Sequence, residues 1–115
     1  NNKITITITT ENGINTISGT VFNEDVQRIV EFNSFYFDIE PKGKMILIRN
    51  NDVPGVIGEV GNILGSNDIN ISDFRLARKK DSALAVILVD SAIDNKLLQN
   101  LENIEAATSV SYVEI

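Results

Sequence analysis

Residues 45–70 read MILIRNNDVPGVIGEVGNILGSNDIN, and this stretch decides the fold. It begins with an apolar run over Met45–Ile48, which predicts a buried strand. The polar turn Asn50-Asn51-Asp52 follows, and Pro54-Gly55 then opens an amphipathic helix. Polar side chains of the turn therefore lie beside the free backbone N–H groups of a helix start. A small charged ligand could be held at that corner.

The helix predicted after Gly55 has one continuous apolar stripe at helical spacing and ends near Ser66-Asn67. A second strand is expected from Ile69 to Ala77, and the nearly all-apolar run Ala83–Val89 predicts a central strand. The predicted stripe consists of Val56, Ile57, Val60, Ile63 and Leu64.

A second helix is predicted by Ile93, Leu97, Leu98, Leu101 and Ile104, which share one helical face, with Asp94 as its N-cap. A last strand is expected over Thr108–Ile115. From residue 44 the order is therefore strand, helix, strand, strand, helix, strand. This order predicts an α+β, ferredoxin-like βαββαβ domain over residues 44–115, with both helices on one face of an antiparallel sheet.

The first 43 residues predict an antiparallel β-meander instead, with no helix to cover its apolar face. Asn12-Gly13 is a type I′ hairpin signal, and Asn33-Ser34 breaks the pattern again. We expect this part to be the end of a truncated domain, linked to the next by residues 41–44. The four predicted strands are Lys3–Thr9, Ile14–Phe22, Val26–Phe32 and Phe35–Ile39.

The composition argues against several functional classes. The chain has no histidine and no cysteine, so the commonest general base, thiolate metal sites and disulfides are absent. The net charge of −6 is opposite to that of a nucleic-acid-binding protein, and no apolar run is long enough to span a membrane. Gly58 and Gly61 lie inside a helix pattern and do not form a dinucleotide fingerprint. We expect a cytoplasmic, non-catalytic domain with no catalytic or metal-binding residues.

Two segments, 51–58 (NDVPGVIG) and 68–71 (DINI), resemble the signature of ACT domains, which are amino-acid-sensing regulatory modules. The likeness covers about residues 44–115. With residues 18–22 (SGTVF) and 28–31 (RIVE), it extends to the C-terminal part of long-type bacterial D-3-phosphoglycerate dehydrogenases. The resemblance implies that residues 1–43 end an intervening, allosteric-substrate-binding domain. It also implies that the NAD-binding catalytic domains belong to other parts of the parent chain, with no cofactor in this one.

The resemblance further implies a ligand, L-serine or another small amino acid, bound where two ACT domains meet in a homo-oligomer. Bound serine would then exert feedback inhibition on the parent enzyme of serine biosynthesis. Asp52 could bind the ammonium group, and Asn70 would come from the neighbouring chain. The ligand-binding residues implied in this way are Asn50, Asp52, Pro54, Gly55, Val56, Ile57 and Asn70.

Three alternatives remain at this point. Val53 stands where the family usually has arginine, which leaves open an oligomerisation module whose ligand corner has degenerated. Asp52 could be only a turn residue, and Asn70 could merely bond strand backbone. The same two modules also occur in the β chain of iron–sulfur L-serine dehydratases. Arg75, Arg78, Lys79 and Lys80 favour a solvated hairpin tip over an anion site.

Overall fold

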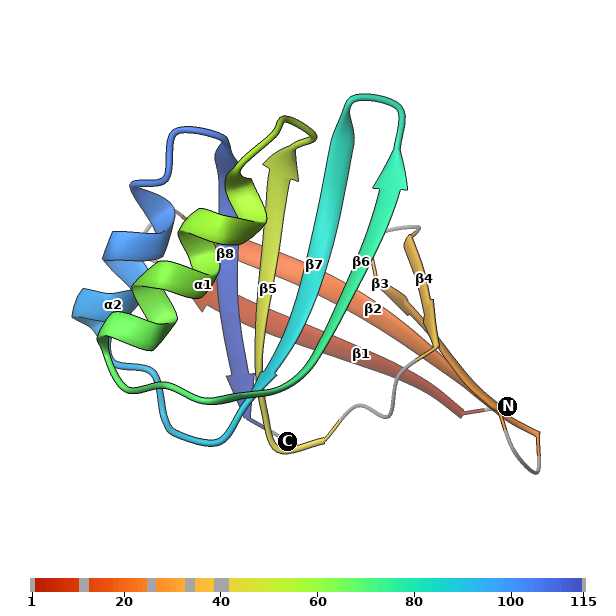
Figure 1. Ribbon diagram of the computed structural model, residues 1–115. Coiled ribbons are helices and arrows are strands. Elements are labelled where there is room, and N and C mark those ends of the chain that lie inside the picture. Colours follow the sequence, from red (N-terminus) through yellow and green to blue (C-terminus); the bar gives the residue numbers. More distant parts are fainter. Residues whose placement is uncertain (1, 11–12, 25–26, 33–34, 39–41, 115) are drawn as a thin grey trace. The chain divides into compact units, whose positions relative to one another are not determined.

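The computed structural model describes residues 2–10, 13–24, 27–32, 35–38 and 42–114 (Figure 1). The chain divides into two compact units, Asn1–Pro41 and Lys42–Ile115. This division lies two residues before the boundary expected between residues 43 and 44. The assignment of the first unit to the end of an intervening domain stays a prediction.

The first unit is a four-stranded sheet in which each strand pairs antiparallel with the next one along the chain. The predicted meander is therefore confirmed. Thr10 opposes Gly13 at the end of the first hairpin, but the turn types predicted at Asn12 and at 33–34 lie outside the described residues. The strands are β1 (Asn2–Thr10), β2 (Gly13–Glu24), β3 (Gln27–Phe32) and β4 (Phe35–Asp38).

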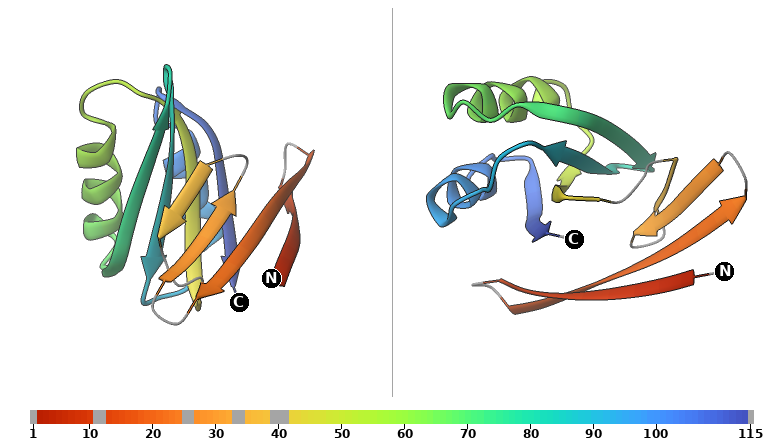
Figure 2. Two further views of the ribbon diagram at one scale, coloured as in Figure 1. Left: turned by 90° about the vertical axis from the view of Figure 1, so that its right-hand side faces the viewer. Right: turned by 90° about the horizontal axis from the view of Figure 1, so that it is seen from below.

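The second unit has the predicted βαββαβ order and a four-stranded antiparallel sheet in the order β6-β7-β5-β8. Both helices lie on one face of this sheet (Figure 2). The ferredoxin-like arrangement is thus confirmed. The elements are β5 (Lys44–Asn51), α1 (Val56–Ser66), β6 (Ile71–Lys79), β7 (Ser82–Val89), α2 (Asn95–Glu102) and β8 (Ala107–Glu114).

The main core of the second unit lies between its sheet and the two helices. Ile46 and Ile48 of β5 pack there with Ile87 of β7, Leu64 of α1 and Leu101 of α2. The alternate residues of β5 and β7 are also buried, so both strands are apolar on both faces, as central strands are. These alternate residues are Met45, Leu47, Leu84, Val86 and Leu88.

Strand β6 begins at Ile71, two residues later than the predicted start at Ile69, and ends at Lys79. The delay has a local cause, because the chain after α1 first closes the helix. Asp68 adopts a left-handed φ of 58°, and the Ile69 N–H donates to the Leu64 carbonyl at 3.0 Å. Pairing with β7 starts only where Ile71 opposes Val89.

The apolar stripe of α1 is narrower than predicted. Val56, Val60 and Leu64 are buried, and Ile63 packs partly against the core. Ile57, however, is 48% exposed, so its inclusion in the core-facing stripe was wrong. Successive helical residues lie about 100° apart around the axis, and one step from Val56 turns Ile57 away from the sheet.

Among the described residues, no helix is long and apolar enough to cross a membrane.

The predicted N-cap of α2 is confirmed, because the Asp94 carboxylate accepts a hydrogen bond from the Leu97 N–H at 2.8 Å. We expect Asp94→Ala to lower the free energy of unfolding by about 1 kcal/mol, as loss of a capping side chain usually does. Urea denaturation measures this change. The matched Asp94→Asn variant should retain most of the stability, and equal losses in both variants would contradict a capping role.

Tyr112 of β8 makes stability depend on pH. Burial raises the pKa of Tyr112 to about 12, and the hydrogen bond from its hydroxyl to Glu114 Oε1, 2.7 Å long, acts in the same direction. The folded chain therefore holds this proton more tightly than the unfolded chain, whose tyrosines titrate at about pH 10. The resulting stabilisation is complete below about pH 10 and is lost as the pH rises towards about 12.

We expect the free energy of unfolding to fall between those pH values, and Tyr112→Phe to remove most of that fall. Denaturant unfolding at a series of alkaline pH values measures it. Tyr36 remains in the variant and reports the background. An unchanged slope in Tyr112→Phe would show that another group is responsible.

Candidate functional site

A cavity of about 140 Å³ lies at the start of α1. Its walls come from the end of β5, the turn that follows, the first turn of α1, and the neighbouring parts of β6 and β7. The β5–α1 turn and the β6–β7 turn lie at the same end of the second unit (Figure 1). The lining residues are Asn50, Asp52, Val53, Pro54, Gly55, Val56, Ile57, Gly58, Leu76, Arg78 and Ala83.

Gly55 sets the direction in which the chain enters α1. Its φ of 90° and ψ of −10° lie in the left-handed region, where a side chain would be strained. The first helical hydrogen bond runs from the Glu59 N–H to the Gly55 carbonyl at 3.0 Å. In this described segment no side chain caps the helix start. The N–H groups of Val56, Ile57 and Gly58 therefore have no partner within the helix, and these residues line the cavity.

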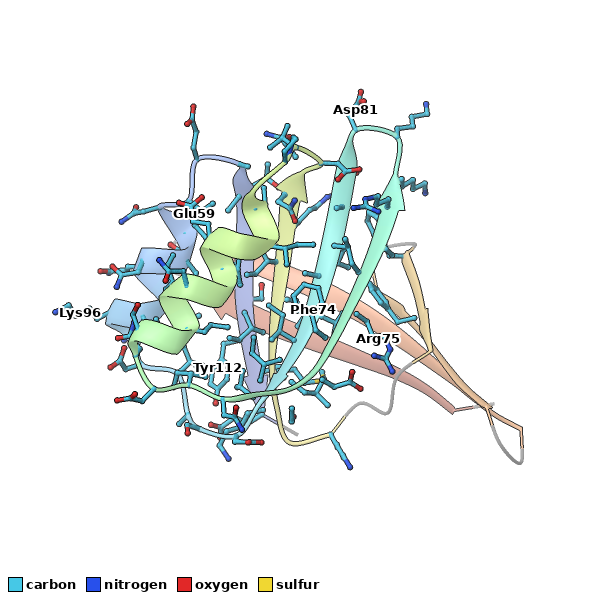
Figure 3. The ribbon with its side chains drawn as sticks, viewed as in Figure 1. Glu59, Phe74, Arg75, Asp81, Lys96 and Tyr112 are labelled. Atoms are coloured by element: carbon cyan, nitrogen blue, oxygen red, sulfur yellow. The ribbon has the colours of Figure 1, made fainter. Side chains whose placement is uncertain are left out.

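Asp52 is held to the β6–β7 hairpin by both its backbone and its side chain. Its N–H donates to the Asp81 carbonyl at 2.8 Å, and its carboxylate lies 3.2 Å from Arg78 Nε. Figure 3 shows Asp81 at the tip of that hairpin. The Asp52 side chain is 29% exposed, so part of it remains accessible from solvent. The arrangement gives the cavity a carboxylate whose position is fixed by neighbouring strands.

Arg78 lies near the hairpin tip, as predicted, and it is also a residue of this corner. Although 63% of its side chain is exposed, it lines the cavity and pairs with Asp52. The strand period of two gives a signal for this position. Phe74 and Leu76 pack against the helix-side core, and Arg78 is next on the same face of β6.

Asn50 lies on the helix-side face of β5, two residues beyond Ile48, and is 5% exposed. Its side-chain amide donates to the Asn51 carbonyl at 2.9 Å. The register between β5 and β8 shifts between Arg49 and Asn50, at the strand end beside the cavity. Asn50 is thus a buried and hydrogen-bonded residue in the wall of the cavity.

Asn70 does not line this cavity. Its side-chain amide donates to Asp90 Oδ2 at 3.0 Å, and its carbonyl accepts from the Asp90 N–H at 3.1 Å. One chain therefore brings together six of the seven predicted ligand residues and leaves Asn70 apart. Its assignment to a neighbouring chain's site stays a prediction.

The residues that would form a dinucleotide site or a metal site are not arranged for either role in the described part of the chain. Gly58 and Gly61 lie within α1 and not in a loop between a strand and a helix, so they do not suit a dinucleotide phosphate group. Within the described ranges, no group of three or more His, Cys, Asp or Glu side chains is placed to hold a metal ion.

Several curated proteins are similar to this chain. "D-3-phosphoglycerate dehydrogenase" of Bacillus subtilis is 34% identical over 116 residues, covering 99% of this chain and 22% of the relative. The protein of that name from Archaeoglobus fulgidus is 31% identical over 86% of this chain and 19% of the relative. "D-3-phosphoglycerate dehydrogenase 2, chloroplastic" of Arabidopsis thaliana is 34% identical over 71% and 14%. The chain thus spans about a fifth, or less, of these relatives' length.

One solved structure, the C-terminal domain of the MgtC protein from Mycobacterium tuberculosis, matches with a TM-score of 0.49 and 16% identity. The match covers 65% of this chain and 92% of that one, and it is too weak to place any residue. The family model described as "ACT domain" matches residues 44–106, which is more than half of the chain and includes the whole cavity. By this match and by its fold, the chain belongs to the ACT domain family.

Proposed function

We propose that this chain is a regulatory module that binds L-serine at the cavity beside α1, between two copies of itself. In this proposal serine acts as the feedback inhibitor of a D-3-phosphoglycerate dehydrogenase of which the chain is a part. The observation that carries the proposal is the convergence of six of the seven predicted ligand residues on one cavity.

The size and chemistry of the cavity suit an α-amino acid. Pockets for drug-sized ligands are usually about 300 Å³ or larger, and this cavity of about 140 Å³ is smaller. The N–H groups of the first turn of α1 and the positive end of its dipole favour a carboxylate. Asp52 offers a carboxylate for an ammonium group. A free amino acid carries both of these groups within a few bonds of each other.

The surroundings of the cavity favour a second copy of the chain. Val53 and Ile57 line the cavity yet are 50% and 48% exposed, so a neighbouring surface would remove apolar area from water. Asn70 lies apart from the cavity of its own chain, and a second copy could bring its Asn70 to the ligand. Ile71, next to Asn70, is 36% exposed as well.

The relatives support the choice of parent enzyme. The match to the Bacillus subtilis protein extends over both units of the chain, and its name is that of the dehydrogenase rather than the serine dehydratase. We therefore place the module in a cytoplasmic, NAD-dependent enzyme of serine biosynthesis, with catalysis and NAD binding in other parts of the parent chain. Serine that binds one arrangement of the two modules more tightly than another would shift the enzyme towards that arrangement.

A second candidate is an oligomerisation module without a ligand. It is favoured by the Asp52–Arg78 ion pair, which already gives Asp52 a partner. The two functions differ in how they respond to serine. A ligand-binding module gains stability when serine is added, whereas a purely structural dimer does not.

We expect calorimetric titration of the 115-residue chain with L-serine to show saturable binding, close to one ligand per chain and tighter than glycine or D-serine. Asp52→Asn should weaken serine binding by about tenfold or more, because it removes the negative charge that strengthens the hydrogen bond from the ammonium group. The matched control is Asp73→Asn. Asp73 is similarly exposed and pairs with Arg75 on β6, but it does not line the cavity.

Serine binding that survives in Asp52→Asn would contradict the assignment of the ammonium group to this carboxylate. The absence of any amino-acid binding by a folded dimer would instead favour the oligomerisation module.

A mixing experiment tests whether two chains share each site. Asn70→Ala and Asp52→Ala chains should each lose serine binding when measured alone. A mixed dimer of the two would contain one intact site and one doubly altered site. After complete exchange, about a quarter of the wild-type capacity should therefore return. No recovery after verified exchange would show that both residues serve the ligand within one chain.

A further inference from the structure

We infer that Arg78 determines the ligand class of this corner. Arg78 and Asp52 form a two-charge clamp that accepts a zwitterion, with the ligand's carboxylate on the Arg78 guanidinium and its ammonium on Asp52. The inference rests on the proposed function and adds to it the role of Arg78 and a preference among classes of ligand. The clamp would select free amino acids over amines without a carboxylate and over acids without an amine.

The position of Arg78 supports this role. Its backbone opposes Ala83 of β7, and both residues line the cavity. Ala83 is completely buried and has only a methyl side chain, so it leaves space beside the arginine. The Asp52 backbone is bonded to the same hairpin through the Asp81 carbonyl, which keeps the two charged groups in register. Both charged groups are therefore anchored to the same hairpin.

The hydrogen-bonding capacity of the pair exceeds what the pair itself uses. Arg78 Nε lies 3.2 Å from the Asp52 carboxylate, and a guanidinium has five N–H donors in one plane. The remaining donors can meet a second carboxylate in the two-pronged geometry that arginine favours. Asp52 likewise has more than one acceptor position. Both partners can hold a ligand group without separating.

The charges of the lining residues explain the preference for free amino acids over amines and acids. Among the eleven lining residues, Asp52 and Arg78 are the only ones with charged side chains. An amine approaching Asp52 gains its attraction but meets the repulsion of Arg78, and an acid approaching Arg78 meets the repulsion of Asp52. A zwitterion satisfies both charges at once. The positive end of the α1 dipole, at residues that also line the cavity, adds to the preference for a carboxylate.

A matched ion pair on the same strand makes the test specific. Arg75 Nη1 lies 2.6 Å from Asp73, and neither residue lines the cavity. Arg75 extends from a part of β6 nearer its start, away from the hairpin tip marked by Asp81 (Figure 3). Arg75→Gln therefore removes the same charge from the same strand as Arg78→Gln, but not from the clamp.

The experiment compares L-serine with L-serinamide, which keeps the amine and hydroxyl but has a neutral amide in place of the carboxylate. Calorimetry is done at about pH 6, where an α-amino group with a pKa of about 7.7 is protonated. We expect the wild-type chain to bind L-serine about tenfold or more tightly than L-serinamide. Arg78→Gln should weaken serine and strengthen serinamide, so that the ratio of the two affinities falls towards one.

Arg75→Gln should leave that ratio at the wild-type value, and Arg78→Lys should retain part of it because the charge remains. Arg78→Met also removes the charge but keeps an unbranched side chain. It gives the same comparison if circular dichroism shows that Arg78→Gln is unfolded. A merely structural role for Arg78 would lower both affinities together and would not move their ratio.

The outcomes separate the two proposals. Wild-type binding of serine with an unchanged ratio in both neutral Arg78 variants would overturn the clamp and leave the proposed function standing. Failure of the wild-type chain to bind any amino acid would overturn the proposed function, and the clamp with it. A ratio that collapses in the Arg78 variants alone establishes the clamp.

Discussion

The backbone of the turn after β5 is the constraint on which the candidate site depends. The Asn51 N–H donates to the Ala106 carbonyl, and the Asp52 N–H donates to the Asp81 carbonyl, each at 2.8 Å. These two bonds tie the turn to the segments before β8 and between β6 and β7. Gly55 then accepts the left-handed φ that turns the chain into α1. Without this course of the backbone, Asp52 and the start of α1 would not border the same cavity.

The cavity is lined both by two charged side chains and by exposed apolar side chains, and these two features have separate consequences. Asp52 and Arg78 are partly exposed, so their ion pair adds little to the stability of the fold. That leaves the pair available to a ligand at small cost to folding. Val53 and Ile57 are exposed apolar side chains of the lining. Their burial by a second copy would couple ligand binding to assembly, which is the physical basis of regulation in the proposed function.

Sequence reasoning was accurate where a pattern repeats and inaccurate where one residue decides. The elements of the second unit, the central position of β7 and the Asp94 cap follow from apolar spacing and capping chemistry. Ile57 was wrongly assigned to the core-facing stripe of α1. In the sequence, an apolar residue next to such a stripe cannot be distinguished from a residue that belongs to it. The start of β6 was misplaced because the closing bonds of α1 use the backbone of Ile69 first. Arg78 was missed because it sits among other cations near a hairpin tip.

Six of the residues around the cavity were implied by the resemblance to ACT domains. By itself, the sequence determined the βαββαβ order and the polar turn before Pro54-Gly55. These are local properties, set by side-chain period, turn chemistry and the special conformation of glycine. Only the tertiary structure decided that Arg78 meets Asp52 and that Asn70 is bonded to Asp90 in its own chain. The first contact joins residues that are 26 positions apart in the sequence, and the second joins residues that are 20 positions apart. Such contacts depend on strand register and on how the chain closes the helix, and no short stretch of sequence specifies either of these.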